Sequence, residues 1–258
     1  MIATLNPEAT VGSLVAENPR RAKVFESLGI DYCCGGKRPL TEVLAEKGLE
    51  LDAVLQALVS AMQQSTEQPD DWNTRSLTEL ADHIVTTHHL HLRRELPRIA
   101  GLLAKVVKAH STSHPELNEL AMIFKEFSAE LFDHMGKEEE ILFPAVRAIE
   151  SGGDHWVLAM INRPIHCMEE EHARAGEALE RMRHLTHGHT PPEGACNTYR
   201  ALLVALADLE QDMHVHVHKE NHILFPRALR ASEIGEESVD LQDSQLSNRR
   251  NCRSGVHR

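Results

Sequence analysis

One stretch of the sequence occurs twice. Residues 134–144 read His-Met-Gly-Lys-Glu-Glu-Glu-Ile-Leu-Phe-Pro, and residues 216–226 read His-Val-His-Lys-Glu-Asn-His-Ile-Leu-Phe-Pro. Seven of the eleven positions are identical, and the copies lie at an offset of 82 residues, from 134 to 216. A repeat at a fixed offset within one chain indicates a duplicated supersecondary unit.

Each copy contains a His-x-x-x-Glu pair, His134 with Glu138 and His216 with Glu220. On an α-helix, residues four apart share one face, because they are separated by about 40° and about 6 Å of rise. An imidazole beside a carboxylate suits borderline metals such as iron or zinc. Two copies that face each other could therefore hold two metal ions bridged by the carboxylates. The alternative is two exposed helix faces with ordinary His–Glu contacts.

Two further histidines extend the pattern. His89 lies 45 residues before His134, and His172 lies 44 residues before His216. Each half then has one histidine on the first helix of a hairpin and a His-x-x-x-Glu pair on the second. Two such hairpins pack as an up-down four-helix bundle, whose interior is where facing helices build metal sites. A slip of one residue would exchange His88 for His89, and the spacing favours His89. The predicted ligands are His89, His134, Glu138, His172, His216 and Glu220.

Composition limits the functional classes. The chain has 258 residues, of which 41% are hydrophobic and 4% aromatic, and long Ala/Leu/Glu/Arg-rich stretches favour helices. A net charge of −12 argues against general nucleic-acid binding, which depends on basic surface. The start of the chain does not look like a signal peptide, and no apolar run approaches the ~18 residues of a membrane span. Five unevenly spaced cysteines do not look like a disulfide framework. We therefore expect an all-α protein in the cytoplasm, with reduced thiols and no membrane partner.

The chain divides into four parts by composition. Residues 1–64 are expected to form a small helical domain that carries two adjacent cysteines. Residues 65–75 cluster Pro, Asp, Asn and Thr without apolar periodicity and are expected to form a linker. Residues 76–231 are expected to form the bundle. Residues 232–258 turn polar, which predicts a disordered tail.

Two Ser-x-x-Glu capping boxes are predicted to start the first two bundle helices, Ser76 with Glu79 and Ser113 with Glu116. Pro164 is expected to open the third helix. The four helices are expected at about 77–108, 115–144, 164–187 and from beyond residue 192 to about 230.

The N-terminal part contains a second unusual feature, the adjacent Cys33 and Cys34 in the Gly-rich loop 31–37. Thiolates are nucleophilic and bind metals when their pKa falls, so a functional role is predicted. The alternative is a pair of inert thiols near a turn. A permanent disulfide between neighbouring residues is strained and is not predicted. Glu171, next to His172, is a further candidate for a role at the site.

These residues together resemble a known family, the hemerythrin-like di-iron proteins for repair of iron centres. The resemblance covers residues from about 10 to 231. It depends on the sequence Asp-Tyr-Cys-Cys-Gly-Gly-Lys at 31–37 and on the six His and Glu residues with their Leu-Phe-Pro tails. It implies a hemerythrin-like up-down four-helix bundle preceded by a small helical N-terminal domain. It also implies two non-haem iron ions, bridged by carboxylates and by oxo or hydroxo groups.

The resemblance further implies a cytoplasmic protein that repairs iron–sulfur clusters damaged by nitrosative or oxidative stress. Its partners would be damaged iron–sulfur proteins, and nitric oxide would be a ligand of the iron; a homodimer stays open. Oxygen-carrying hemerythrins use a fifth histidine, whereas here Met168 and Gly176 flank His172 at a distance of four residues. This departure favours the repair family over an oxygen carrier.

The leading hypothesis is a protein that supplies labile iron to damaged clusters and is not itself an enzyme. Cys33 and Cys34 would receive iron or a nitrosyl group, or dock the damaged partner. One alternative is a nitric-oxide binding protein that scavenges the radical, which would be an enzyme if it reduced nitric oxide. The others are an oxygen-binding hemerythrin and a metal-free helical interaction module.

Overall fold

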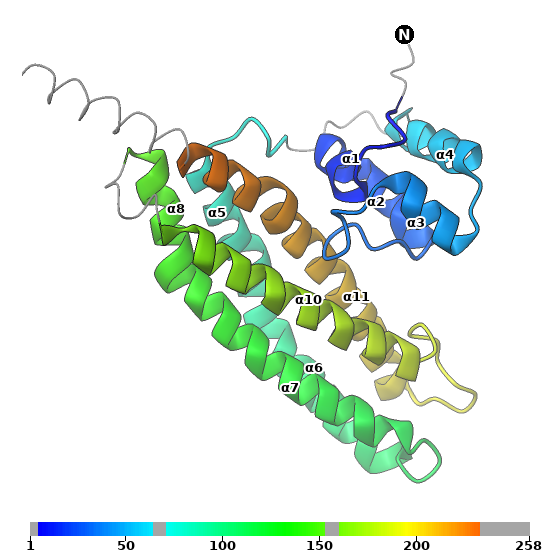
Figure 1. The fold of residues 1–258 in the computed structure, drawn as a ribbon. Helices are drawn as coiled ribbons and strands as arrows, with labels where there is room; N and C mark the ends of the chain where they lie inside the picture. The colour runs from blue at the N-terminus through cyan, green and yellow to red at the C-terminus, as the bar shows by residue number, and fades with distance from the viewer. Residues whose placement is uncertain (1–4, 64–70, 153–159, 233–258) are drawn as a thin grey trace, which may run out of the picture.

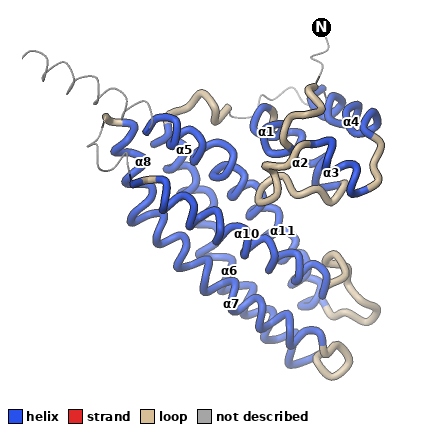
Figure 2. The backbone as a smooth tube through the Cα atoms, in the orientation of Figure 1, coloured by secondary structure: helices blue, strands red, loops and turns tan. Residues whose placement is uncertain are grey.

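A computed structural model describes residues 5–63, 71–152 and 160–232 of the chain. In these ranges the chain forms a four-helix bundle, with a smaller group of N-terminal helices beside it (Figure 1). Helices joined by loops make up this part of the chain, in which Figure 2 shows no strand. The all-α fold class is therefore confirmed. None of the described helices combines the length and the apolar character needed to cross a membrane.

Four long helical segments form the bundle, and three of them change helix type along their length. The first comprises α5 (Leu77–Ile84), η2 (Val85–His89) and α6 (Leu90–His110). The second comprises α7 (Glu116–Lys137), η3 (Glu138–Leu142) and α8 (Phe143–Glu150). The third is α10 (Asn162–Leu185). The fourth comprises α11 (Asn197–Lys219) and η4 (Glu220–Leu224) and stays helical to residue 232.

The three η segments of the bundle are turns of π-helix. In each, the backbone N–H after the segment donates to the carbonyl five residues earlier, for example from Phe143 to Glu138 and from Phe225 to Glu220. Pro144 and Pro226 follow directly. Proline has no N–H and its ring clashes with the carbonyl four residues earlier, so an ordinary α-turn is disfavoured there. The repeated Phe-Pro therefore has a structural reason, a local widening of the helix.

The structure confirms one of the two predicted capping boxes and contradicts the other. The Ser76–Glu79 capping box is present, with Ser76 Oγ accepting from the Glu79 N–H at 3.0 Å. The box predicted at Ser113 is wrong, because α7 begins only at Glu116 and no side chain caps it. Ser113 instead belongs to the turn that closes α6, and its hydroxyl donates to the His110 carbonyl at 3.2 Å. Helix α10 begins two residues before Pro164, which is tolerated because first-turn N–H groups need no helical partner.

Five short helices form the N-terminal group. They are α1 (Val11–Glu17), the 3-10 turn η1 (Pro19–Arg21), α2 (Ala22–Ser27), α3 (Leu40–Lys47) and α4 (Leu51–Gln63). Figure 1 shows the group lying beside α10 and α11. Its position places the loop between α2 and α3, residues 31–37, against the bundle.

The apolar core consists of two clusters. The larger joins the N-terminal helices to the half of the bundle built from α6, α7, the C-terminal part of α10 and α11. The smaller joins α5, α8, the start of α10 and the end of the fourth segment. A layer of buried histidine and glutamate side chains lies on the same helices between the two clusters. The predicted domain boundaries stay predictions. Residues 65–70 of the predicted linker and residues 233–258 of the predicted tail lie outside the described residues, as does residue 64 of the predicted N-terminal domain.

Candidate metal centre

The six side chains predicted as ligands lie together in this polar layer. His89 ends η2, Glu138 begins η3 and Glu220 begins η4. His134 and His216 lie one turn before these carboxylates, and His172 comes from α10. All six are buried, with at most 3% of each residue exposed. Three of the six therefore occupy the ends of π-turns, which are rare and frequently mark functional sites.

The six side chains form two groups that share both carboxylates. One group is His89, Glu138, His216 and Glu220, and the other is His134, Glu138, His172 and Glu220. Within each group the ligand atoms lie within 4.8 Å of one another. Each group also takes one imidazole from each hairpin. This is the arrangement expected of two neighbouring metal positions bridged by carboxylates.

Several buried polar atoms in the layer lack hydrogen-bond partners among the described residues. They include His89 Nε2, both carboxylate oxygens of Glu138, and Glu220 Oε2. Glu138 Oε2 lies 3.3 Å from His89 Nε2 and 3.4 Å from His134 Nε2, but without the geometry of a hydrogen bond. Buried carboxylates without hydrogen bonds are costly unless a cation compensates them. The donor set, imidazole nitrogens with carboxylate oxygens, fits iron.

The charge of the centre follows from its neighbours. Although burial opposes ionisation, the surrounding imidazoles lower the pKa of Glu138 and of Glu220. Burial also lowers the pKa of His134, but Glu138 and Glu171 outweigh it and raise that pKa to about 10. Both carboxylates are therefore ionised at neutral pH. A metal ion that binds His134 must displace its proton, so metal uptake is coupled to proton release.

Three of the four imidazoles are held from outside by a hydrogen bond at Nδ1. His89 Nδ1 donates to Glu139 at 2.8 Å, His134 Nδ1 to Glu171 at 2.9 Å, and His172 Nδ1 to Asn221 at 2.8 Å. Such bonds fix the ring and leave Nε2 facing the centre.

Glu171 thus contacts His134 rather than the shared carboxylates. The hydrogen bond from His134, together with Lys137, lowers the pKa of Glu171 to about 2, against the opposing effect of burial. Lys137 Nζ lies 2.5 Å from the other oxygen of this carboxylate. Glu171 therefore stays ionised and holds His134 in one orientation.

Sequence reasoning missed two of these outer partners, Glu139 and Asn221. Both directly follow the repeated glutamate, at matching positions of the two copies. These matching positions in the repeat were the sequence signal that could have identified the two partners. The structure also separates His89 from His88, because His88 turns away to Asp212 at 2.9 Å and Lys219 at 2.8 Å.

The two predicted cysteines lie at the edge of the centre. Cys33 is buried and Cys34 partly exposed, and neither forms a disulfide. The Cys34 thiol donates to the backbone carbonyl of His172 at 3.2 Å. A hydrogen bond with Cys34 and burial raise the pKa of the Cys33 thiol well above its usual value. Cys34 is therefore the more accessible of the two thiols.

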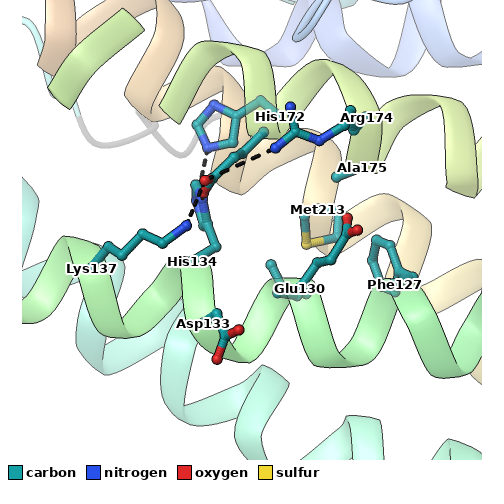
Figure 3. A pocket seen from close by; sticks show the side chains of 11 residues that line it. Phe127, Glu130, Asp133, His134, Lys137, His172, Arg174, Ala175 and Met213 are labelled. Atoms are coloured by element: carbon teal, nitrogen blue, oxygen red, sulfur yellow. Dashed lines mark hydrogen bonds and ion pairs between the residues drawn. The ribbon is translucent and has the colours of Figure 1, made fainter. Parts of the chain in front are cut away.

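A cavity of about 140 Å³ opens beside one half of the centre. His134 and His172 approach each other over it from α7 and α10, with their Nε2 atoms 3.0 Å apart (Figure 3). The remaining lining side chains are mostly charged. They are Glu130, Asp133, Lys137, Glu171 and Arg174, with Phe127, Leu131, Ala175 and Met213.

Comparisons with known proteins point to the same kind of site. The hemerythrin HHE cation binding domain matches residues 80–228, and ScdA_N, a domain of unknown function (DUF542), matches residues 7–62. Similar proteins include the iron-sulfur cluster repair protein YtfE of Yersinia pestis (strain Pestoides F) and that of Yersinia pseudotuberculosis (serotype O:1b). Each is 37% identical over 221 residues, which cover 86% of this chain and 96% of the relative.

The chain belongs to the hemerythrin-like iron-sulfur cluster repair family. The family membership implied by the paired motifs is therefore confirmed. Membership of a hemerythrin family and the buried His and Glu groups together indicate iron binding. Which residues ligate the iron, and in how many positions, stays a prediction.

Proposed function

We propose that this protein repairs damaged iron–sulfur clusters by supplying iron from a two-iron centre in the bundle. The observation that carries the proposal is the pair of four-residue groups that share Glu138 and Glu220. The relatives named as iron-sulfur cluster repair proteins support the same function. Its targets are then iron–sulfur proteins that have lost iron.

The donor set explains why such iron could be given up. His89 and His216 would hold one ion, and His134 and His172 the other, with Glu138 and Glu220 shared between them. Bound iron would supply exchangeable coordination, because two imidazoles and two shared carboxylates leave a six-coordinate ion incomplete. The thiolates of a damaged cluster are softer ligands, of the type that iron–sulfur clusters select. Transfer to them is therefore favourable.

The cavity beside His134 and His172 supports a direction for transfer. Charged side chains line it between these two histidines and the surface. Three of the five charged side chains are acidic, and Glu171 is paired with Lys137 and Arg174. Glu130 and Asp133 are therefore the carboxylates that would attract a cation leaving the centre. Ionised Glu171 holds His134 through Nδ1, so displacement of Glu171 would loosen one predicted ligand at the inner end of the cavity.

The test follows iron rather than activity alone. Protein loaded with isotopically labelled iron is mixed with a nitric-oxide-damaged four-iron cluster protein, and Mössbauer spectra follow the label. We expect the label to appear in the repaired cluster. The Glu138→Leu/Glu220→Leu double variant should bind little iron and repair little. A Cys33→Ser/Cys34→Ser variant, compared in parallel, separates loss of iron from loss of docking.

Two outcomes would contradict the proposal. One is repair by iron-free protein, or by the double glutamate variant, at the rate of the loaded protein. The other is stoichiometric uptake of nitric oxide without loss of iron, which would favour scavenging.

A further inference from the structure

Asn221 contacts both the candidate metal centre and the N-terminal helices. Its side-chain oxygen accepts a hydrogen bond from His172 Nδ1 at 2.8 Å. Its side-chain nitrogen donates to the backbone carbonyl of Cys33 at 3.5 Å. Asn221 is buried, at 5% exposed, so water competes little for these bonds. One amide group therefore joins a predicted ligand to the loop 31–37, called the cysteine loop below.

Further contacts fix the cysteine loop at the same place. The ring of His222 donates through Nε2 to the Cys33 carbonyl at 2.8 Å. The Cys34 thiol donates to the backbone carbonyl of His172 at 3.2 Å. Gly176, one turn after His172, leaves room for this thiol, because a Cβ there would lie 3.1 Å from Cys34 Sγ. The loop thus contacts the backbone of His172 directly and its ring through Asn221.

The other half of the centre has no matching link among the described residues. Glu139 occupies the position of Asn221 in the first copy of the repeat and accepts from His89 Nδ1 at 2.8 Å. Its carboxylate also pairs with Arg93 at 3.0 Å. The duplication therefore gives both histidines an outer partner, but only the partner of His172 continues to Cys33.

We propose that Asn221 is a positioning residue that couples the cysteine loop to the half of the centre formed by His134 and His172. Metal bound in that half and the seated loop then stabilise each other through the orientation of His172. Engagement of Cys34, by a partner or a reagent, unseats the loop and weakens iron binding in that half only. The inference rests on the proposed two-iron centre. It adds that the state of the cysteine loop determines which of the two iron ions is released.

Thermodynamic linkage makes the proposal measurable. If metal binding favours the seated loop, the seated loop must favour metal binding by the same factor. Couplings of this kind typically change an affinity by about 5- to 150-fold. The seated Cys34 thiol lies against α10, so its reaction with iodoacetamide reports the unseated state. Mass spectrometry of the peptide that contains Cys33 and Cys34 separates it from Cys167, Cys196 and Cys252, and its fragment ions separate alkylation of Cys34 from alkylation of Cys33.

The experiment uses the full chain, with ferrous iron alone as the metal probe under anaerobic conditions. Iron binding is titrated by equilibrium dialysis, and the Cys34 alkylation rate is measured with and without iron. In the wild type, iron should slow alkylation at least about fivefold, the lower end of such couplings. In Asn221→Ala this ratio should fall to about one, because the link is cut.

Two matched variants sharpen the result. Glu139→Ala removes the outer partner of His89, so it should weaken iron binding, yet keep the wild-type alkylation ratio. Asn221→Asp keeps an acceptor for His172 and loses the donor to Cys33. It should therefore retain more iron than Asn221→Ala while still losing the coupling, and it serves where Asn221→Ala fails to fold.

Clear results would overturn the inference. An unchanged alkylation ratio in both Asn221 variants would show that the amide carries no coupling. An equal loss of the ratio in Glu139→Ala would show a general loosening of the bundle instead. A wild type that binds fewer than two ions would sink the proposed two-iron centre first. If the coupling is intact but no iron is transferred to a damaged cluster, only the repair mechanism is contradicted.

Discussion

At the scale of single residues, neighbours in sequence have different tasks. His89 places Nε2 3.3 Å from Glu138, inside the polar layer. His88 is equally buried but donates to Asp212 and stacks on His216, with ring centroids 5.1 Å apart. His91 lies nearer the surface. A helix turns about 100° per residue, so three nearby histidines reach three different surroundings.

We predict that His89→Gln lowers the affinity for iron by more than about 100-fold, beyond the 10- to 100-fold typical of losing an outer partner. His91→Gln should leave the iron content unchanged. His88→Gln should have a smaller effect than His89→Gln, because His88 reaches the predicted ligands only by stacking on His216. Iron content by mass spectrometry after dialysis measures all three. Equal losses in His88→Gln and His89→Gln would place the wrong histidine in the centre.

At the scale of helical elements, the caps determine where each bundle helix begins. Ser76 and Glu79 satisfy two N–H groups at the start of the first segment. The Glu150 carboxylate accepts from the N–H groups of Leu77 and Thr78 at 2.6 and 2.9 Å. These bonds tie the start of the first segment to the end of the second. Ser113 stands in a similar sequence pattern but caps no helix.

Replacing each serine tests this difference. Ser76→Ala should lower the free energy of unfolding by about 1 kcal/mol, the usual cost of losing an N-cap. Ser113→Ala removes only an exposed hydrogen bond and should stay within about 0.5 kcal/mol of the wild type. Urea unfolding of matched samples, followed by circular dichroism, measures both. Two equal effects would mean that the cap at Ser76 contributes nothing specific.

At the scale of the whole molecule, the N-terminal helices contact α11 and η4 through histidine rings that lie against glycine backbone, and this contact is called the seam below. His218 Nε2 donates to the Gly12 carbonyl at 3.0 Å, and the His222 ring lies against Gly12 and Gly36. A Cβ on Gly12 would clash with the His222 ring. Burial lowers the pKa of His218 to about 3, so this histidine is neutral. The seam depends on small residues and uncharged rings.

The same substitution should therefore have opposite effects at two helical glycines. Gly12→Ala overpacks the seam and should lower the free energy of unfolding by about 1–3 kcal/mol. Gly101→Ala lies on an open face of α6, with nothing within 4 Å of the added Cβ. It should raise stability by about 0.5–1 kcal/mol, because alanine favours helix. Thermal unfolding of the two variants checks the signs, and a stable Gly12→Ala protein would contradict the tight seam.

Much of this could be predicted from sequence. The duplicated His-x-x-x-Glu pairs and the matching intervals to His89 and His172 predicted the four-helix bundle and the residues that meet in its interior. The π-turns could not be predicted, because a shift of one hydrogen bond hardly alters the apolar pattern of a helix. The Ser113 box failed because a capping pattern does not reveal whether a preceding helix has ended.

The pairing of imidazoles also lay beyond the sequence. Equal spacing shows that the hairpins are alike but not how they face each other. Only the fold pairs His89 with His216 and His134 with His172. The link from Asn221 to Cys33 joins residues 188 positions apart, and no local pattern could indicate it.

Each predicted iron position draws one imidazole from each hairpin, which has a consequence for biosynthesis. A nascent chain that has emerged only as far as the first hairpin carries His89, His134 and Glu138, but the complete ligand set of neither position. Both positions are completed together, once Glu220 has left the ribosome and the second hairpin has folded. If these residues hold the iron, its insertion follows translation of the chain to Glu220, and products that end before the second hairpin lack both complete ligand sets.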